Sequence, residues 1–227
     1  MQPPARLVVQ AEALAWLREH PAEPGDAIVT SLPDLSELPE LGRGLDGWQR
    51  WFVDAAAELM RWPSPESVSL FYQSDIRFQG RWVDKAYLIQ RAAEQAGATL
   101  LSHQIVCRRA PGTPSQGRPG YSHLLAFTRG PAAPPRRARP DVLAEAGATS
   151  WSRGMGLFAC QAACRFVLDE TAARRVVDPF CGRGLLLAVA NDLGLDALGV
   201  ELSAKRCRAA RSATTQDPGS ATRGTAP

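Results

Sequence analysis

Residues 176–184 read Val-Val-Asp-Pro-Phe-Cys-Gly-Arg-Gly, and this stretch decides the fold. An apolar strand ends in a carboxylate, Asp178, and is followed by a turn with two glycines and an apolar helix expected over residues 185–193. In an open α/β sheet, a turn at the carboxyl end of a strand borders the ligand crevice. Gly182 and Gly184 allow close backbone approach and torsions that other residues disfavour. The stretch therefore predicts a parallel α/β sheet with a ligand-binding turn.

The next expected strand, residues 197–201, also ends in an acid, Glu201. Its spacing from Asp178 fits one β-α-β unit, and an acid at this place can accept hydrogen bonds from a ribose diol. A dinucleotide site is less well supported, because the pattern G-x-G-x-x-G is absent and Leu187 stands where its third glycine would fall.

Apolar runs alternate with amphipathic stretches along the rest of the chain, which is typical of a mostly parallel sheet flanked by helices. The other strands are expected at residues 6–10, 26–30, 67–73 and 175–178, with an antiparallel pair at 100–109 and 121–129. The other helices are expected at residues 12–19, 48–61, 84–96, 154–169 and 204–211.

One domain is expected over residues 1–212, made of two halves at 1–129 and 151–212. The segment between them, 130–150, begins with a run rich in proline, glycine and arginine and is predicted to be a linker. Residues 213–227 are small and polar and are predicted to be disordered.

The composition, 45% hydrophobic and 22% charged residues, is that of an ordinary globular protein. No apolar run is long enough to span a bilayer and no N-terminal targeting pattern is present, so a cytoplasmic location is expected. The five cysteines form no C-x-x-C pair and only three histidines accompany them, so no metal site is expected.

The motifs at residues 178–184 (D-P-F-C-G-R-G) and 199–203 (G-V-E-L-S) closely resemble those of class I S-adenosylmethionine-dependent methyltransferases. The likeness is greatest to the branch that methylates amino groups of DNA and RNA, at adenine N6 or cytosine N4, although Arg183 replaces a usual small residue. The resemblance implies a Rossmann-like three-layer sandwich that binds S-adenosylmethionine. It assigns to the cofactor Glu12, Thr30, Asp178, Phe180, Cys181, Gly182, Gly184, Glu201 and Leu202.

Glu12 is assigned to the cofactor site because residues 10–14 resemble the G-D-A-L that opens many such enzymes, where the acid contacts adenine. Taken alone, Glu12 is an ordinary acid in the first turn of a helix, where it favours the helix dipole.

Residues 26–34 (Asp-Ala-Ile-Val-Thr-Ser-Leu-Pro-Asp) resemble the second signature of that branch, a strand ending in (D/N/S)-P-P-(Y/F/W). The resemblance makes Ser31 the side-chain acceptor and Leu32 the carbonyl acceptor for an amino group; Pro33 matches, and Asp34 replaces the aromatic residue that usually stacks on the base. The acceptor would then be held by hydrogen bonds to Asp34 or by an aromatic residue from elsewhere. On its own, Ser-Leu-Pro-Asp is also an ordinary exit from a strand.

The chemistry explains why such a loop is needed. An exocyclic amino nitrogen delocalises its lone pair into its ring and is a poor nucleophile. Acceptors that hold its hydrogens make the nitrogen more nucleophilic, and preorganised groups are effective because they stabilise charge that develops in the transition state.

The catalytic loop comes first in the chain and the cofactor loop last, as in the circularly permuted group of amino methyltransferases. This order requires the strand ends near residues 32 and 180 to lie side by side. Residues 150–156 fall where that group has an extra methionine-binding loop.

The expected substrate is an amino group of a nucleic acid base, with RNA favoured over duplex DNA because only a short connector stands where a recognition insert would be. A protein partner or a homodimer could supply that recognition. Asp75, Arg81 and Trp82, in a polar, cationic and aromatic connection after the third strand, are predicted to contact substrate. A small-molecule methyltransferase and a noncatalytic cofactor-binding protein are the alternatives.

Overall fold

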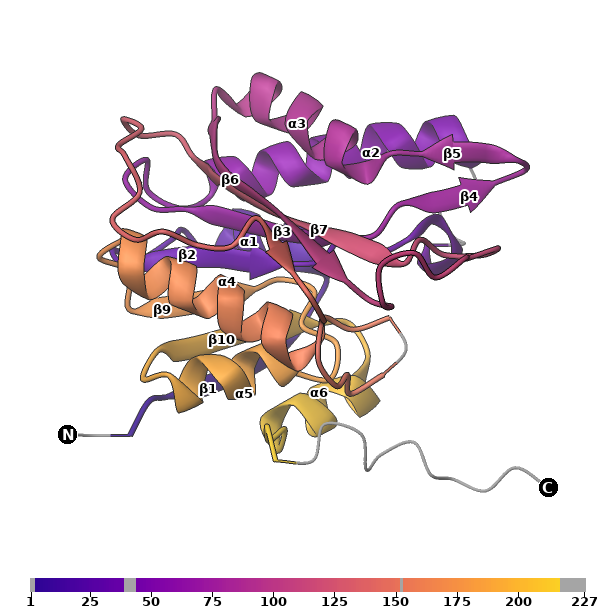
Figure 1. Ribbon diagram of the computed structural model, residues 1–227. Helices are drawn as coiled ribbons and strands as arrows, with labels where there is room; N and C mark the ends of the chain where they lie inside the picture. The colour runs from indigo at the N-terminus through magenta and orange to yellow at the C-terminus, as the bar shows by residue number, and fades with distance from the viewer. Residues whose placement is uncertain (1–2, 39–43, 152, 217–227) are drawn as a thin grey trace.

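The computed structural model describes residues 3–38, 44–151 and 153–216, and its centre is a mixed sheet (Figure 1). The strand order is β1-β10-β9-β2-β3-β7-β6-β8, with the first five parallel and β7 antiparallel to both β3 and β6. The strands are β1 (Arg6–Gln10), β2 (Asp26–Thr30), β3 (Ser69–Gln73), β6 (Thr99–Cys107), β7 (Tyr121–Thr128), β8 (Val142–Leu143), β9 (Arg175–Asp178) and β10 (Asp196–Glu201). The expected mostly parallel α/β sheet with an antiparallel pair is confirmed.

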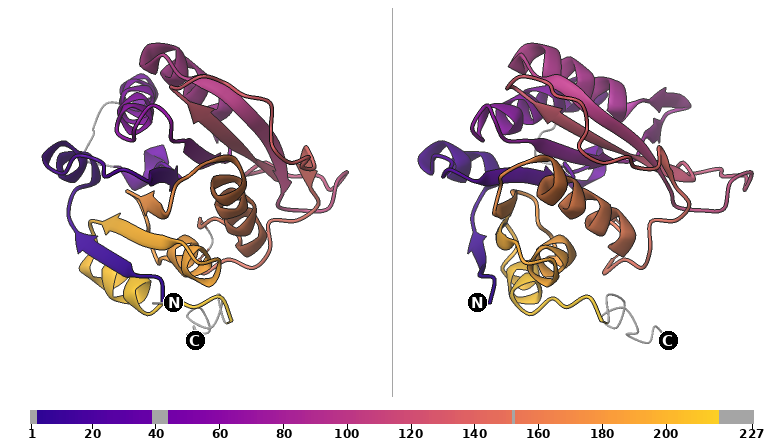
Figure 2. Two further views of the ribbon diagram at one scale, coloured as in Figure 1. Left: turned by 90° about the vertical axis from the view of Figure 1, so that its left-hand side faces the viewer. Right: turned by 60° about the vertical axis from the view of Figure 1, so that its left-hand side comes forward.

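Helices cover both faces of the sheet and give three layers (Figures 1 and 2). One face carries α1 (Ala13–Glu19), α2 (Gly44–Arg61) and α3 (Lys85–Ala96), and the other carries α4 (Leu157–Glu170), α5 (Leu185–Asp192) and α6 (Ala204–Arg211). Alternate residues of β3 point to opposite layers, so that Leu70 belongs to the core cluster that contains α4 and α5, while Phe71 belongs to the cluster that contains α2 and α3. Each such fully buried side chain contributes roughly 1.5–3 kcal/mol.

The strands β2 and β9 are direct neighbours, although about 150 residues separate them in the sequence. They pair in parallel with Ile28 opposite Val177. Parallel neighbours end at the same edge of a sheet, so the loop after Thr30 and the loop after Asp178 begin side by side. This juxtaposition is the one that the reversed motif order requires.

A small hairpin, β4 (Ile76–Phe78) and β5 (Arg81–Val83), occupies a stretch expected to be an irregular connection. Its two-residue turn is formed by Gln79 and Gly80, which both have positive φ, 49° and 79°. Such a turn matches the right-handed twist of the two flanking strands.

The segment between the halves, residues 130–150, is docked on the body. Its strand β8 pairs with β6, and Arg139 binds Asp169 and Glu170 at the end of α4. Helix α4 begins three residues later than expected, after Gly156, whose backbone is extended with φ −77° and ψ 160°. Gly156 packs against the backbone of Ala146 so closely that a Cβ atom would lie only 2.1 Å from the carbonyl oxygen.

The tail predicted to be disordered is residues 213–227, and residues 217–227 of it lie outside the described residues. Within the described part of the chain, no helix combines the length and the apolar character that crossing a membrane requires.

Candidate active site

A cavity of about 680 Å³ lies at the carboxyl ends of the parallel strands. This volume is in the usual range for a site that binds a small molecule or cofactor. The cavity brings together eleven of the residues singled out in the sequence: Glu12, Ser31, Leu32, Pro33, Asp178, Phe180, Cys181, Gly182, Gly184, Glu201 and Leu202. The cofactor loop and the catalytic loop therefore face one shared space.

Asp178 is a buried carboxylate that lines the cavity. Its Oδ1 accepts hydrogen bonds from Thr30 Oγ1 at 2.6 Å and from the backbone N–H of Phe180 at 3.1 Å. Burial raises the pKa of Asp178 to about 7, because the cost of desolvating the charge exceeds the gain from these two donors. Thr30 does not line the cavity; it joins β2 to β9 and holds Asp178 in place.

The glycines of the cofactor loop are required by its backbone. Gly182 and Gly184 have φ values of 55° and 77°, in the left-handed region that favours glycine. A Cβ atom on Gly184 would also lie 2.7 Å from the Cα atom of Ala210 in α6. The backbone of the loop therefore packs closely against α6. The loop also leads directly into the positive N-terminal end of α5, which begins after Gly184.

The two other predicted acids, Glu201 and Glu12, come from neighbouring strands on one side of the cofactor loop: Glu201 ends β10, and Glu12 follows β1, which pairs with β10. Glu201 is buried, and its Oε1 accepts a hydrogen bond from the N–H of Ser203 at 2.7 Å. Both oxygens of Glu12 accept hydrogen bonds from the first turn of α1, from Leu14 N at 3.2 Å and Ala15 N at 2.7 Å. Glu12 is therefore an N-cap that lines the cavity, and a ligand has to share its carboxylate with the helix.

The catalytic loop presents two hydrogen-bond acceptors to the cavity. Within the described residues, neither Ser31 Oγ nor the Leu32 carbonyl oxygen accepts a hydrogen bond from the protein. The loop itself is fixed: the Pro33 carbonyl accepts from Trp48 Nε1 at 3.3 Å, and Glu37 accepts from the N–H of Asp34 at 2.9 Å. Two free acceptors on a fixed loop suit the binding of an amino group.

Asp34 lies just outside the large cavity, in a narrow neighbouring recess that shares Ser31 and Leu32 with it. Its carboxylate binds the buried ammonium of Lys85 on one side and Arg118 on the other, at 2.7 Å. Burial lowers the pKa of Lys85, an effect that Asp34 opposes. The structure thus gives Asp34 two cationic partners that the sequence did not reveal.

Two tryptophans also line the cavity: Trp51, which the sequence reasoning missed, and Trp151. Trp51 packs edge-on against Phe180 with ring centroids 6.4 Å apart, and Arg206 lies over Trp151 at 5.1 Å. Trp51 looked like one apolar position of an amphipathic helix. Trp151 belongs to residues 150–156, where position alone predicted a methionine-binding loop, and Ser150, Arg153, Gly154 and Met155 of that segment do line the cavity.

The cavity does not include the predicted substrate-contacting residues Asp75, Arg81 and Trp82. Asp75 is buried and accepts hydrogen bonds from the N–H of Lys85 at 2.9 Å and from Trp82 Nε1 at 3.2 Å, which explains why it is withdrawn from the surface. Arg81 and Trp82 lie on β5 and are exposed.

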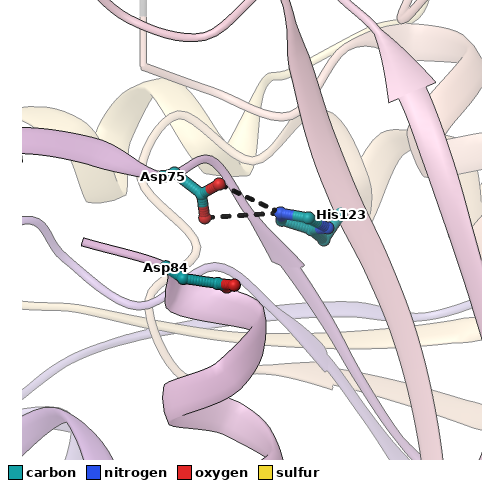
Figure 3. Close-up of side chains that lie close together, drawn as sticks. All are labelled: Asp75, Asp84 and His123. Carbon is teal, nitrogen blue, oxygen red and sulfur yellow. Dashed lines mark hydrogen bonds and ion pairs between the residues drawn. The ribbon is translucent and has the colours of Figure 1, made fainter. Parts of the chain in front are cut away.

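Asp75 also faces His123 at 3.3 Å, with Asp84 nearby (Figure 3). One ligand atom from each of these three side chains lies within 4.8 Å of the others, a spacing that could hold a metal ion. The existing hydrogen bonds already satisfy Asp75 without one.

The sequence matches no protein-family profile, and no curated protein is significantly similar to it. Solved structures show the likeness instead. TTHA0409 from Thermus thermophilus, solved with S-adenosyl-L-methionine, aligns over 94% of this chain and 96% of its own, with a TM-score of 0.67 and 19% identity. The PvuII DNA methyltransferase, which is cytosine-N4-specific, aligns over 92% and 88%, with a TM-score of 0.69 and 14% identity. M1.HpyAVI in complex with SAM aligns over 91% and 97%, with a TM-score of 0.60 and 14% identity. The chain has the fold of these proteins over nearly its whole length.

Proposed function

We propose that this protein is an S-adenosylmethionine-dependent methyltransferase that acts on an amino group of a nucleic acid base. One observation carries the proposal: the buried acids Asp178 and Glu201 line the same cavity as Ser31 and Leu32, whose Oγ atom and carbonyl oxygen accept no hydrogen bond from the described residues. The glycine turn at Gly182 and Gly184 fits the cofactor, because it lets the backbone approach a ligand where a side chain would intrude.

Each residue has a defined task in this proposal. The cofactor supplies an electrophilic methyl group when bound. Asp178 holds the loop through the N–H of Phe180, and Glu201 accepts hydrogen bonds from the ribose hydroxyls. Ser31 Oγ and the Leu32 carbonyl accept the hydrogens of the amino group and raise the electron density on its nitrogen as the new N–C bond forms. The N–C bond would form as the S–CH₃ bond of the sulfonium breaks, which would leave S-adenosylhomocysteine as the second product, and the methylated nitrogen would release one proton to solvent.

Within nucleic acids, we favour RNA or another single-stranded substrate. The segment that joins the halves, residues 130–150, is short and docked on α4, so the described chain offers no separate domain to read a duplex. Arg118 and Arg153 lie around the recess next to the catalytic loop and can contact phosphates, which gives affinity without sequence reading.

A small-molecule acceptor is the second candidate, favoured by one observation: Asp34 stands where the amino-methylating branch has a stacking aromatic residue. Trp51 and Trp151 offer aromatic faces in the cavity for either acceptor. Binding that weakens steeply with salt separates the two, since a small neutral acceptor releases no condensed counterions.

The test combines cofactor binding with methyl transfer. Calorimetry with S-adenosylmethionine should show one site, and tritiated-methyl cofactor should label RNA or single-stranded DNA in preference to duplex DNA and metabolite fractions. Cofactor binding without labelling of any fraction would instead identify a noncatalytic binding protein. Absence of cofactor binding would overturn the proposal.

A further inference from the structure

We propose that Gln73 is a specificity-determining residue of the acceptor site and that Lys85 positions it together with Asp34. This inference rests on the proposed function. The three residues form the wall of the narrow recess beside the catalytic loop, here called the Asp34 recess, which also includes Arg118. They come from three separate elements: Asp34 precedes η1 (Leu35–Glu37), Gln73 ends β3 and Lys85 begins α3.

Lys85 connects the other two. Its ammonium binds one oxygen of Asp34 and donates to Gln73 Oε1 at 3.4 Å, and its side chain is only 2% exposed. The aromatic rings of Trp48 and Phe52, each 5.6 Å from the Nζ atom, also face the charge. A long cationic chain buried this deeply has few alternative positions, so it fixes both partners.

Gln73 is left with an unused donor. Its side chain is buried, and its Nε2 atom has no hydrogen-bond partner within the described residues. The amide cannot be turned round, because Nε2 would then face the Lys85 ammonium and two donors would oppose each other. A buried unpaired donor is costly, so an acceptor atom that reaches it gains a favourable bond.

The recess is too narrow for a ring, because its volume of about 30 Å³ has room for only about two water molecules. It joins the large cavity at Ser31, Leu32, Glu37, Arg153 and Gly154. A ring held in the large cavity can therefore extend only its edge atoms into the recess. The ligand edge that fits has an amino group beside a ring nitrogen. The amino group donates one hydrogen to the catalytic loop and shares the other between that loop and the carboxylate of Asp34, and the ring nitrogen accepts from Gln73.

Asp34 thereby has a physical role in place of a stacking ring. An aromatic residue holds a base by its face and accepts any base, whereas a carboxylate beside an amide NH₂ recognises one pattern of donors and acceptors. Arg118, bound to the outer oxygen of Asp34 and about one-third exposed, can swing away when the acceptor arrives.

The experiment compares two pairs of probes with the protein saturated in S-adenosylhomocysteine. Adenosine 5′-monophosphate is paired with its 1-deaza analogue, and cytidine 5′-monophosphate with its 3-deaza analogue; each analogue keeps the amino group and lacks the neighbouring ring nitrogen. In the wild type, one parent nucleotide should bind about tenfold more tightly than its analogue, the value of one hydrogen bond. In Gln73→Met this ratio should fall to about one. Gln104→Met is the matched control, because Gln104 is equally buried but bonds the Pro140 carbonyl.

The role of Lys85 has its own readout. The chain has only two lysines, Lys85 and Lys205, so lysine labelled with ¹⁵N at Nζ gives two NMR signals. The preferred nucleotide should shift the Lys85 signal and leave that of exposed Lys205 in place. Lys85→Met should abolish the discrimination between nucleotide and analogue, and Lys205→Met should not.

Three outcomes would overturn the inference: equal binding of both members of each pair by the wild type, an unchanged ratio in Gln73→Met, or, for the role of Lys85, an unmoved Lys85 signal. Affinity for S-adenosylhomocysteine, measured in the same samples, tests the proposed function separately. A protein that binds this ligand but does not discriminate between the nucleotides refutes the inference alone.

Discussion

The two ends of the cavity are built in different ways. At the cofactor end, the acid, the turn and the second acid lie within one β-α-β unit, and each acid accepts a hydrogen bond from a near neighbour, Phe180 N for Asp178 and Ser203 N for Glu201. The bond from Thr30 to Asp178 is the long-range exception. At the acceptor end, the loop after β2 depends on side chains from remote elements, including Trp48, Lys85 and Arg118. In terms of the proposed function, the cofactor end is encoded mostly by near neighbours in the sequence, whereas the acceptor end is assembled from distant parts of the chain.

Thr30 is where the two ends meet. Its hydroxyl group belongs to the strand that leads to the catalytic loop, and it donates to the carboxylate of Asp178 at 2.6 Å. A change at one end can therefore reach the other through this bond. The predictions below separate the two ends, from the largest expected effect to the smallest.

Asp178→Ala should greatly lower the affinity for S-adenosylmethionine. The variant loses the carboxylate that binds both Thr30 and the Phe180 N–H, and two charge-assisted hydrogen bonds together correspond to about a thousandfold in affinity. Calorimetric titration with S-adenosylmethionine measures the loss. Asp192→Ala, an exposed acid at the end of α5, is the control and should bind normally. Unchanged affinity in Asp178→Ala would remove the cofactor site from this loop.

Ser31→Ala should lower methyl transfer without changing cofactor affinity. Removing one preorganised hydrogen-bonding group from a transition state lowers turnover about 100-fold. Cofactor affinity should stay the same, because Ser31 Oγ bonds none of the cofactor-loop residues described. Single-turnover methyl transfer and calorimetry on the same sample give both values. Ser31→Thr keeps the hydroxyl group and should retain much of the activity; equal activity in Ser31→Ala would refute the assignment.

Glu201→Gln should weaken the cofactor end by a smaller amount. The amide keeps one oxygen for the N–H of Ser203 but loses the charge that strengthens bonds to a ribose diol, so affinity should fall about tenfold. Glu12→Gln provides a contrast, because Glu12 caps α1. Its main effect should be a lower melting temperature, with a smaller loss of cofactor affinity than in Glu201→Gln. If the two variants exchange these effects, the roles of the two acids are reversed.

The pH dependence of stability should report on Asp178. Its folded-state pKa of about 7 lies above its ordinary value of 3.8, so its favourable contribution is complete below pH 3.8 and is lost as pH rises through about 7. The free energy of urea unfolding of the ligand-free protein should thus fall across this range. Asp75 has a lowered pKa, so its contribution to stability is instead lost as pH falls below about 3.8. To isolate Asp178, the pH profile of the wild type is compared with that of Asp178→Asn. An identical pH profile in that variant would exclude Asp178 as the source.

Much of the fold was predictable because its signals are local. Apolar runs that end in an acid, Asp178 and Glu201, identified two neighbouring strands, and the glycines between them identified the turn. The hairpin at residues 76–83 was not predicted, since each of its strands has only three residues and its turn begins at Gln79, which is rarely found with positive φ.

The candidate site was predictable in part for the same reason. Residues adjacent to a strand end could be assigned from motif position, whereas Trp51 and Lys85 lie on helices, where a tryptophan normally indicates core and a lysine indicates solvent. Lys85 is buried only because Asp34, Gln73 and the rings of α2 surround it. No pattern in the residues next to Lys85 carries that information.

By itself, the sequence determined the class of fold, the cofactor turn and the order of the two loops along the chain, because hydrophobic periodicity and turn chemistry act between near neighbours. The resemblance also implied that the strand ends near residues 32 and 180 lie side by side, as the pairing of β2 with β9 shows. The tertiary structure alone decided that the charge of Asp34 is balanced by Lys85 and Arg118, and that Asp75 is withdrawn from the surface. These features depend on contacts between residues far apart in the chain, and only the packed sheet with its two helical layers brings such residues together.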